Sequence, residues 1–303
     1  MSEADNAPAW DGRQAGRYEV WYLTFNHLAS RTGFWIRYTL EAPRAGAPGA
    51  RVWFAAFDHD RPQGTVAFNR RYPRADLELG ARPFQVRVGA SCLRHDGARG
   101  EIEGAGHHAR WDLAWAAGGA THRHLPAFAY RTPFADTRVL SPNPLLAIDG
   151  TVEVDGRRFD LCAQPGGQSH LWGRAHADAW AWGRCSAFDE GGQGYLETLT
   201  VRVRRAGFLL PPLTFLTLRL DGAEMRFTAA RSALRSRGRF GTGRYEFAAA
   251  SRDVRLQGEF TSPPELLVQA EYADPGGDRR FCANTEVGDL ALTLERRLAR
   301  AGW

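Results

Sequence analysis

The stretch TVEVDGRRFDL, Thr151 to Leu161, decides the fold class. Apolar and polar residues alternate on both sides of its central Asp155-Gly156 pair. Such alternation places every second side chain on one face, as in a half-buried strand. Asp-Gly is favoured where both central residues of a two-residue turn need a positive φ. The stretch therefore predicts a β-hairpin.

The same pattern recurs along the chain from Tyr18, and helical periodicity is nearly absent. Asp-Gly also occurs at Asp96, Asp149 and Asp221. Strands are predicted in YEVWYLTFN (18–26), GFWIRYTLEA (33–42), ARVWFAAFD (50–58), ETLTVRVRR (197–205), LTFLTLRLDG (213–222), GRYEFAAAS (243–251), DVRLQGEFTS (253–262), ELLVQAEYAD (265–274) and DLALTLERR (289–297). The sequence predicts an all-β protein with little helix.

This number of strands exceeds one small barrel, and barrel closure is the usual way in which an all-β chain removes its sheet edges. We therefore expect two antiparallel β-barrels side by side. The glycine-rich FDEGGQGY (188–195) is the predicted seam. The expected division is a flexible N-terminus at residues 1–16, a first domain at 17–190 and a second at 191–303.

The 39 basic residues are all arginine, and the formal charge is +5. They are scattered singly among acids, which argues against a nucleic-acid partner. The densest basic stretch runs from Arg226 to Arg244. It is either a solvated strand face or a surface for phosphates or lipid headgroups, which allows transient contact with a membrane surface.

We expect a cytoplasmic protein without an integral membrane segment. The polar start MSEADNAPAWDGRQAG (1–16) is not typical of a secretory signal, and no apolar run approaches the roughly 20 residues of a membrane helix. The four cysteines form no C-x-x-C pair, and we expect them to be buried as small hydrophobic residues. The sequence does not indicate the oligomeric state.

A tryptophan-rich segment, SHLWGRAHADAWAWGRC (169–185), holds the main candidate site. On a strand, Trp180, Trp182 and Arg184 point to one face, opposite a nearly bare one. The two indoles are either a packed core pair or a flat wall for a ligand.

His170, beside Trp172, is a candidate general acid or base, although a histidine on a strand is often only hydrogen-bonded to backbone. Glu19 alternates with Trp21 on an early strand that also carries Tyr22. A carboxylate there lies either at a barrel rim or buried with a raised pKa, and in the second case it is a proton donor.

Four histidines, His107, His108, His122 and His124, raise the question of a metal. A His-x-His pair on one strand face can bind zinc, but no acidic ligand is placed by the spacing. Exposed loop histidines explain the same pattern, and we predict no metal or other cofactor. The chain also lacks G-x-S-x-G, G-x-G-x-x-G, P-loop and H-E-x-x-H motifs, which excludes the common hydrolases, nucleotide-binding folds and zincins.

Five segments in order resemble a lipocalin-like superfamily that contains carotenoid 1,2-hydratases, tocopherol cyclases and lipocalin-like Diels–Alderases. These are EVWYLTFN (19–26), GEIEGAGHHARWDLAW (100–115), LLAIDGTVEVDGRRFDL (145–161), SHLWGRAHADAWAWGRC (169–185) and CANTEVGDLALTLERR (282–297). The resemblance implies two calycin-type barrels and a hydrophobic isoprenoid or polyketide substrate.

In the hydratases the corresponding motif resembles Asp-His-Glu-Trp followed by Trp-Asp-Trp. Here Ser169 and Leu171 flank His170, and Ala181 separates the two tryptophans. Protonating an alkene needs a strong acid, so these replacements argue against carotenoid hydration. The tryptophan-rich pattern looks closer to the tocopherol cyclase branch.

Two functions remain open from the sequence. One is an enzyme that holds an apolar substrate against Trp180 and Trp182 and uses His170 or Glu19 for acid/base-assisted cyclisation, hydration or isomerisation. Trp21, Tyr22, Trp172 and Arg184 are the further predicted ligand-binding residues. The other is a non-catalytic carrier of a lipid or isoprenoid.

Overall fold

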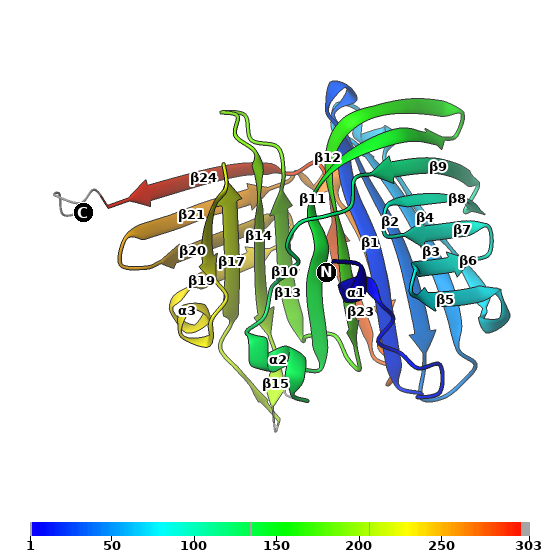
Figure 1. Ribbon diagram of the computed structural model, residues 1–303, viewed down its shortest axis with the longest axis horizontal. Helices are drawn as coiled ribbons and strands as arrows, with labels where there is room; N and C mark the ends of the chain where they lie inside the picture. Colours follow the sequence, from blue (N-terminus) through cyan, green and yellow to red (C-terminus); the bar gives the residue numbers. More distant parts are fainter. Residues whose placement is uncertain (1, 134, 206, 298–303) are drawn as a thin grey trace. The chain divides into compact units, whose positions relative to one another are not determined.

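The computed structural model describes residues 2–133, 135–205 and 207–297. The all-β prediction is confirmed, since strands dominate and the helices are short. The described residues divide into two compact units (Figure 1). Unit 1 is formed by Met1–His122, Asp136–His176 and Val268–Val287, and unit 2 by Arg123–Ala135, Ala177–Leu267 and Gly288–Trp303, in each case by their described residues.

The units do not follow the contiguous division expected from the sequence. Residues 177–190, expected in the first domain, belong to unit 2 because the strand at Ala179–Cys185 pairs with the strand at Gly194–Arg202. Residues 268–287, expected in the second domain, return to unit 1. Each unit therefore combines segments that lie far apart in the chain.

Unit 1 holds most of the long strands. Its elements are α1 (Ser2–Asn6), β1 (Arg17–His27), η1 (Leu28–Ser30), β2 (Thr32–Ala42), β3 (Gly49–Asp58), η2 (Pro62–Gly64), β4 (Val66–Pro73), η3 (Arg74–Asp76), β5 (Leu77–Ala81), β6 (Phe84–Val88), β7 (Ser91–Arg94), β8 (Gly97–Gly104), β9 (His107–Trp115), β11 (Thr137–Val154), β12 (Arg157–Gly173), β22 (Val268–Ala273) and β23 (Arg279–Asn284), with β10 (His122–Arg123) at the unit boundary.

Apart from β22 and β23, which pair with each other, these strands form one antiparallel sheet in the order β4-β3-β2-β1-β12-β11-β9-β8-β7-β6-β5, with β10 paired to β11 (Figure 1). The sheet curls on itself. A Cβ added at Gly104 of β8 would lie only 3.0 Å from the carbonyl oxygen of Asn69 on β4. The result is a nearly closed barrel. The predicted hairpin joins β11 to β12, with Asp155 and Gly156 both at positive φ.

The barrel interior is filled by apolar side chains. On β1, Trp21, Leu23 and Phe25 point inward, and Phe54 of β3 stacks on Trp111 of β9 with ring centroids 6.0 Å apart. Alternation therefore sends the other residues of β1–β3 to the outer face of the sheet.

The N-terminal segment packs against unit 1, whereas a flexible terminus was expected for residues 1–16. Asn6, at the end of α1, is fully buried, and its amide donates to Gln168 Oε1 at 3.0 Å. The indole of Trp21 donates to the Asn6 carbonyl at 2.9 Å. Buried polar partners, which composition alone does not reveal, order this segment.

Unit 2 consists of shorter strands. Its elements are α2 (Ala127–Arg131), β13 (Ala179–Cys185), β14 (Gly194–Arg202), β15 (Arg204–Arg205), β16 (Phe208–Leu209), β17 (Leu213–Leu220), β18 (Ala223–Phe227), α3 (Ala230–Arg235), β19 (Arg237–Gly241), β20 (Arg244–Ala250), β21 (Val254–Thr261), η4 (Pro264–Leu266) and β24 (Asp289–Arg296).

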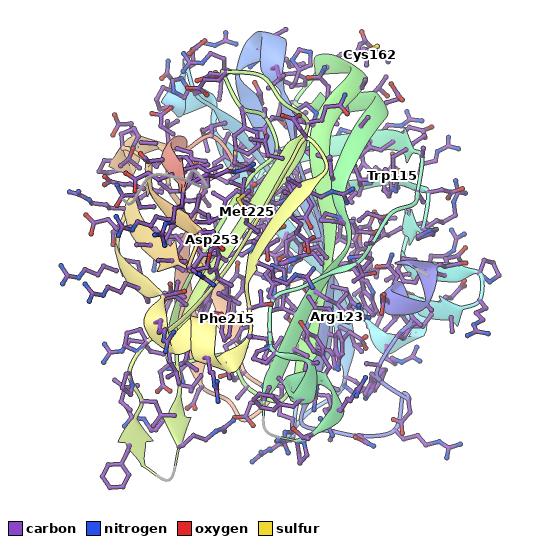
Figure 2. The ribbon with its side chains drawn as sticks, turned by 60° about the vertical axis from the view of Figure 1, so that its left-hand side comes forward. Trp115, Arg123, Cys162, Phe215, Met225 and Asp253 are labelled. Carbon is purple, nitrogen blue, oxygen red and sulfur yellow. The ribbon has the colours of Figure 1, made fainter. Side chains whose placement is uncertain are left out.

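Its described residues form two four-stranded sheets, β13-β14-β17-β18 and β19-β20-β21-β24, and a short β15-β16 pair, rather than the single closed sheet expected for a second barrel. Phe215 and Met225, labelled in Figure 2, lie on neighbouring strands of the first sheet. Tyr245 of the second sheet hydrogen-bonds to Thr198 and Thr200 of the first. The two sheets therefore share one core.

The structure also bears on the predictions about cysteine burial and membrane-spanning helices. All four cysteines are free thiols, and Cys162 (Figure 2) is exposed, so the expectation of uniformly buried cysteines is wrong. It failed because Cys162 falls on the outward position of an alternating strand. Among the described helices, none is both long and apolar enough to cross a membrane.

The barrel interior predicts a measurable packing energy. Phe54→Ala should lower the free energy of unfolding by about 3–5 kcal/mol, because it leaves a cavity beside Trp111. The control Leu28→Ala, at an exposed apolar residue of the same unit, should change it by less than about 0.5 kcal/mol. Urea unfolding followed by far-UV circular dichroism measures both, and equal losses would contradict the assigned core.

Candidate functional site

Glu19 and His170, the predicted acid/base residues, meet in unit 1. They lie on the paired strands β1 and β12, where Trp21 is the register partner of His170. The Nε2 atom of His170 lies 2.8 Å from Glu19 Oε1, and both side chains are only 1% exposed. The structure thus joins two residues that are 151 positions apart.

Backbone groups of the N-terminal segment form the remaining hydrogen bonds of this pair. Glu19 accepts the N–H groups of Ala9 at 2.7 Å and Trp10 at 2.9 Å. The Nδ1 atom of His170 lies 2.8 Å from the Asp5 carbonyl, which can only accept, so Nδ1 carries a proton. The Glu19 carboxyl group thus contacts two backbone N–H groups and Nε2 of His170, and the two side chains share one buried hydrogen bond.

Aromatic rings enclose this hydrogen-bonded pair. His170 stacks on Trp21 with centroids 4.9 Å apart and an interplanar angle of 9°, and Trp172 lies 4.7 Å away at 32°. Tyr22, on the next position of β1, points to the opposite sheet face by alternation. Three of the predicted ligand-binding residues thus lie beside the pair or on its strand.

The other predicted ligand-binding residues, Trp180, Trp182 and Arg184, lie on β13 in unit 2. Trp182 Nε1 donates to Glu197 Oε2 at 2.8 Å, and Arg184 Nε lies 3.3 Å from Glu197 Oε1. His124 Nε2 lies 3.2 Å from the same carboxylate, which is fully buried. Sequence reasoning missed Glu197, although an acid on an apolar strand face was the signal that identified Glu19.

The four histidines considered as metal ligands do not form one site. Two of them contact an aspartate, and the other two belong to different units. His107 Nδ1 lies 2.7 Å from Asp155, and the backbone N–H of His108 donates to the same carboxylate. His122 belongs to unit 1 and His124 to unit 2. Across the described ranges, no three His, Cys, Asp or Glu residues are arranged to hold a metal ion.

The basic stretch from Arg226 to Arg244 has acidic partners at both of its ends. Arg226 pairs with Glu224 at 3.2 Å, and Arg244 contacts both Glu246 and Glu259. These exposed pairs are typical of a solvated strand face.

A cavity of about 340 Å³ opens on the outer face of unit 1. Outward residues of β1–β3 form its floor, and the β22–β23 hairpin supplies another wall. Outward-facing aromatic rings dominate the lining: Tyr18, Trp35, Trp53, Phe57 and Tyr272.

One histidine lines this cavity, and an aspartate orients it. His176 Nδ1 lies 2.5 Å from Asp274 Oδ1, and the backbone N–H of His176 donates to the same oxygen at 2.8 Å. The imidazole stacks on Tyr18, with centroids 4.4 Å apart, and on Tyr272 at 5.6 Å. The ring is therefore held in one plane.

Burial lowers the pKa of His176 despite the hydrogen bond from its ring to Asp274. Burial also opposes ionisation of Asp274, but the hydrogen bonds from His176 outweigh it and lower the pKa of that carboxyl. At neutral pH the pair is a neutral imidazole with Nδ1–H facing a carboxylate. This tautomer has an unprotonated Nε2, the form that a general base requires.

A buried arginine completes the cavity. Arg37 is 6% exposed, and its guanidinium carbon lies 4.2 Å from the Tyr272 ring centroid and 5.7 Å from those of Trp35 and Trp53. Its Nε donates to Thr39 Oγ1 at 3.0 Å. The arrangement combines a cation with aromatic faces.

Sequence reasoning did not select Arg37, His176 or Asp274. Alternation in GFWIRYTLEA already placed Trp35 and Arg37 on one strand face. His176 lies within the tryptophan-rich segment that drew attention to His170. The missing information was which distant segment covers that face.

The nearly closed antiparallel barrel and its aromatic-lined outer cavity define an all-β protein of the lipocalin-like type. Within that class, the chain belongs to the tocopherol cyclase-like family, whose sequence model matches residues 146–302. The resemblance stated from the sequence is thereby confirmed.

Two curated relatives are uncharacterized proteins of Mycobacterium tuberculosis, MT0513 of strain CDC 1551 / Oshkosh and Rv0493c of strain ATCC 25618 / H37Rv. Each is 28% identical to this chain over 294 residues, which cover 96% of this chain and 84% of the relative.

Among solved structures, a Nitrosomonas europaea protein provisionally named AttH superposes with a TM-score of 0.56 at 13% identity, covering 92% of this chain and 91% of that one. At this identity the likeness supports the fold alone. Kievitone hydratase of Nectria haematococca matches with a TM-score of 0.49 at 9% identity, covering 97% and 91%.

The buried Glu19–His170 pair predicts a strong dependence of stability on both partners. His170→Leu should cost about 1–3 kcal/mol or more, because it leaves the buried Glu19 carboxyl group without its side-chain partner. Glu19→Leu combined with His170→Leu should cost less than the sum of the two single changes. As a control on the same strand, Arg158→Leu breaks an exposed pair with Asp160 and should cost at most about 1 kcal/mol. Additive losses in urea unfolding would contradict the coupling.

The lowered pKa of His176 predicts a pH dependence of stability. Below about pH 6.5, the ordinary imidazole pKa, the unfolded chain gains a proton that folded His176 resists, so stability falls as the pH falls. The stability of His176→Asn should fall less between pH 7.5 and 5.5 than that of the wild type. Urea unfolding across this range tests the difference, and parallel curves would contradict it.

Proposed function

We propose that this protein binds a small hydrophobic molecule in the outer cavity of unit 1 and catalyses its cyclisation or isomerisation by proton transfer through His176. The observation that supports this most strongly is the coincidence of an aromatic-lined cavity with one Asp-oriented imidazole. A cavity of about 340 Å³ falls at the lower end of the roughly 300–1,000 Å³ of small-molecule sites.

The charge of the cavity favours removal of a proton as the first step. His176 is neutral at physiological pH, so it suits a base better than an acid strong enough to protonate an alkene. Arg37 stands among the same rings, and its positive charge would oppose a carbocation nearby. An anionic intermediate, by contrast, gains from it.

In this mechanism His176 Nε2 takes a proton from an acidic C–H or O–H bond of the substrate. Asp274 stabilises the imidazolium that forms, as a carboxylate does for any histidine base. The proton then returns to another substrate atom, which leaves the enzyme unchanged.

Under this proposal the Glu19–His170 pair organises the barrel rather than the reaction. Its donors and acceptors are engaged by Asp5, Ala9 and Trp10. Catalysis by His170, the hypothesis from the sequence, would require the N-terminal segment to move away.

A carrier without catalysis is the second candidate. Its support is that Ser169 and Leu171 stand where the carotenoid hydratase pattern has two carboxylates. The same cavity would then hold a ligand without converting it, and we propose the cytoplasm as the site of either function.

The test is to incubate the purified protein with prenylated phenols and polyenoic compounds, following binding by tryptophan quenching and products by mass spectrometry. His176→Asn keeps an N–H near Asp274 but removes the titratable nitrogen. It should lower turnover by roughly 10²–10⁴-fold with little change in binding.

His59→Asn is the matched control, because His59 Nδ1 lies 3.0 Å from Asp60 in the same unit but outside the cavity. It should leave turnover unchanged. Binding without turnover in the wild type favours the carrier, and a wild type that neither binds nor converts any compound refutes both functions. Turnover that survives His176→Asn but not His170→Leu would return the role to His170.

A further inference from the structure

The charge of Arg37 indicates which class of ligand binds in the outer cavity. Arg37 is nine-tenths buried, and within the described ranges no carboxylate lies within ion-pair distance of its guanidinium. A buried charge without a counter-charge is strongly unfavourable unless something pairs with it. Contacts with three aromatic rings and one bond to Thr39 offset only part of that cost.

The carboxylates around the cavity are engaged by other cations. Their pairs are Glu41 with Arg51 at 3.2 Å, Glu271 with Arg279 at 3.3 Å, and Asp274 with Arg280 at 3.8 Å. None of them neutralises Arg37.

The other acidic groups near Arg37 are uncharged at neutral pH. Burial raises the pKa of Tyr272 to about 12 and that of the Cys282 thiol to about 11, and it also raises the pKa of Tyr18. The cavity therefore carries one positive charge that the chain itself does not balance.

We propose that the ligand is a carboxylic acid with a compact apolar body, whose carboxylate pairs with Arg37 while its body packs against Trp35, Trp53 and Tyr272. This inference rests on the proposed function, since it concerns the same cavity. A guanidinium presents its N–H groups in a planar fork that matches a carboxylate, and an ion pair away from water is stronger than one at the surface.

The pairing also fits the proposed reaction. A carboxylate held at Arg37 fixes one end of the substrate, and His176 stacks against Tyr272, the ring over which the guanidinium lies. A proton removed near that carboxylate leaves an anion that the same positive charge stabilises.

The experiment compares acids with their neutral esters. Geranic acid and methyl geranate, and cinnamic acid and methyl cinnamate, are titrated into the wild type at pH 7.5, with affinity measured by calorimetry. Each acid should bind at least about 30-fold more tightly than its ester. Arg37→Gln should abolish this preference and leave ester affinity within about threefold of wild type.

Arg70→Gln is the matched control. Arg70 also lies over a tyrosine, with its guanidinium carbon 5.4 Å from the Tyr72 ring centroid, but it does not line the cavity. The control should keep the preference for acids. Thermal unfolding of each variant separates a loss of recognition from a loss of fold.

The outcomes separate this inference from the function on which it rests. If acids and esters bind the wild type equally, Arg37 does not select an anion, but the cavity remains a binding site. If Arg37→Gln weakens acid and ester alike and lowers the melting temperature, Arg37 only holds the β22–β23 hairpin, and the inference is refuted. If no probe binds the wild type, the proposed function fails as well.

Discussion

The buried contact between Glu19 and His170 is the interaction on which the barrel of unit 1 depends. Two polar side chains that are each 1% exposed need each other, because a buried polar group that loses its hydrogen-bond partner is costly. The pair also accepts the N–H groups of Ala9 and Trp10 and donates to the Asp5 carbonyl. One polar contact thereby both couples two central strands and orders the segment that packs against them.

Unit 2 also contains a buried glutamate that contacts a histidine. Glu197 of β14 is fully buried and receives His124, Trp182 and Arg184. In both units a strand-borne glutamate pairs with a histidine and lies among tryptophans. The residues that look most catalytic in the sequence are thus engaged in hydrogen bonds, and these bonds allow acidic side chains to stand on apolar strand faces.

Sequence reasoning succeeded where the determining interactions are local. The Asp155-Gly156 hairpin is encoded by alternation and turn chemistry within eleven residues, and the structure reproduces it. It failed for the cavity, because Arg37 gains its surroundings from a hairpin more than 220 residues later. Spacing cannot indicate which strand face a distant hairpin covers. The same limit hid the contact between His176 and Asp274, which lie 98 positions apart.

Aromatic walls in a tocopherol cyclase-like chain suggest carbocation chemistry, because ring faces attract positive charge. In the outer cavity, however, Trp35, Trp53 and Tyr272 already face a cation, the guanidinium of Arg37. A second positive charge a few ångströms away would be repelled in this partly desolvated space, whereas a negative one would be attracted. Under the proposed function, the rings therefore keep Arg37 buried, and the guanidinium biases the cavity toward anions, which a neutral His176 generates by taking up a proton.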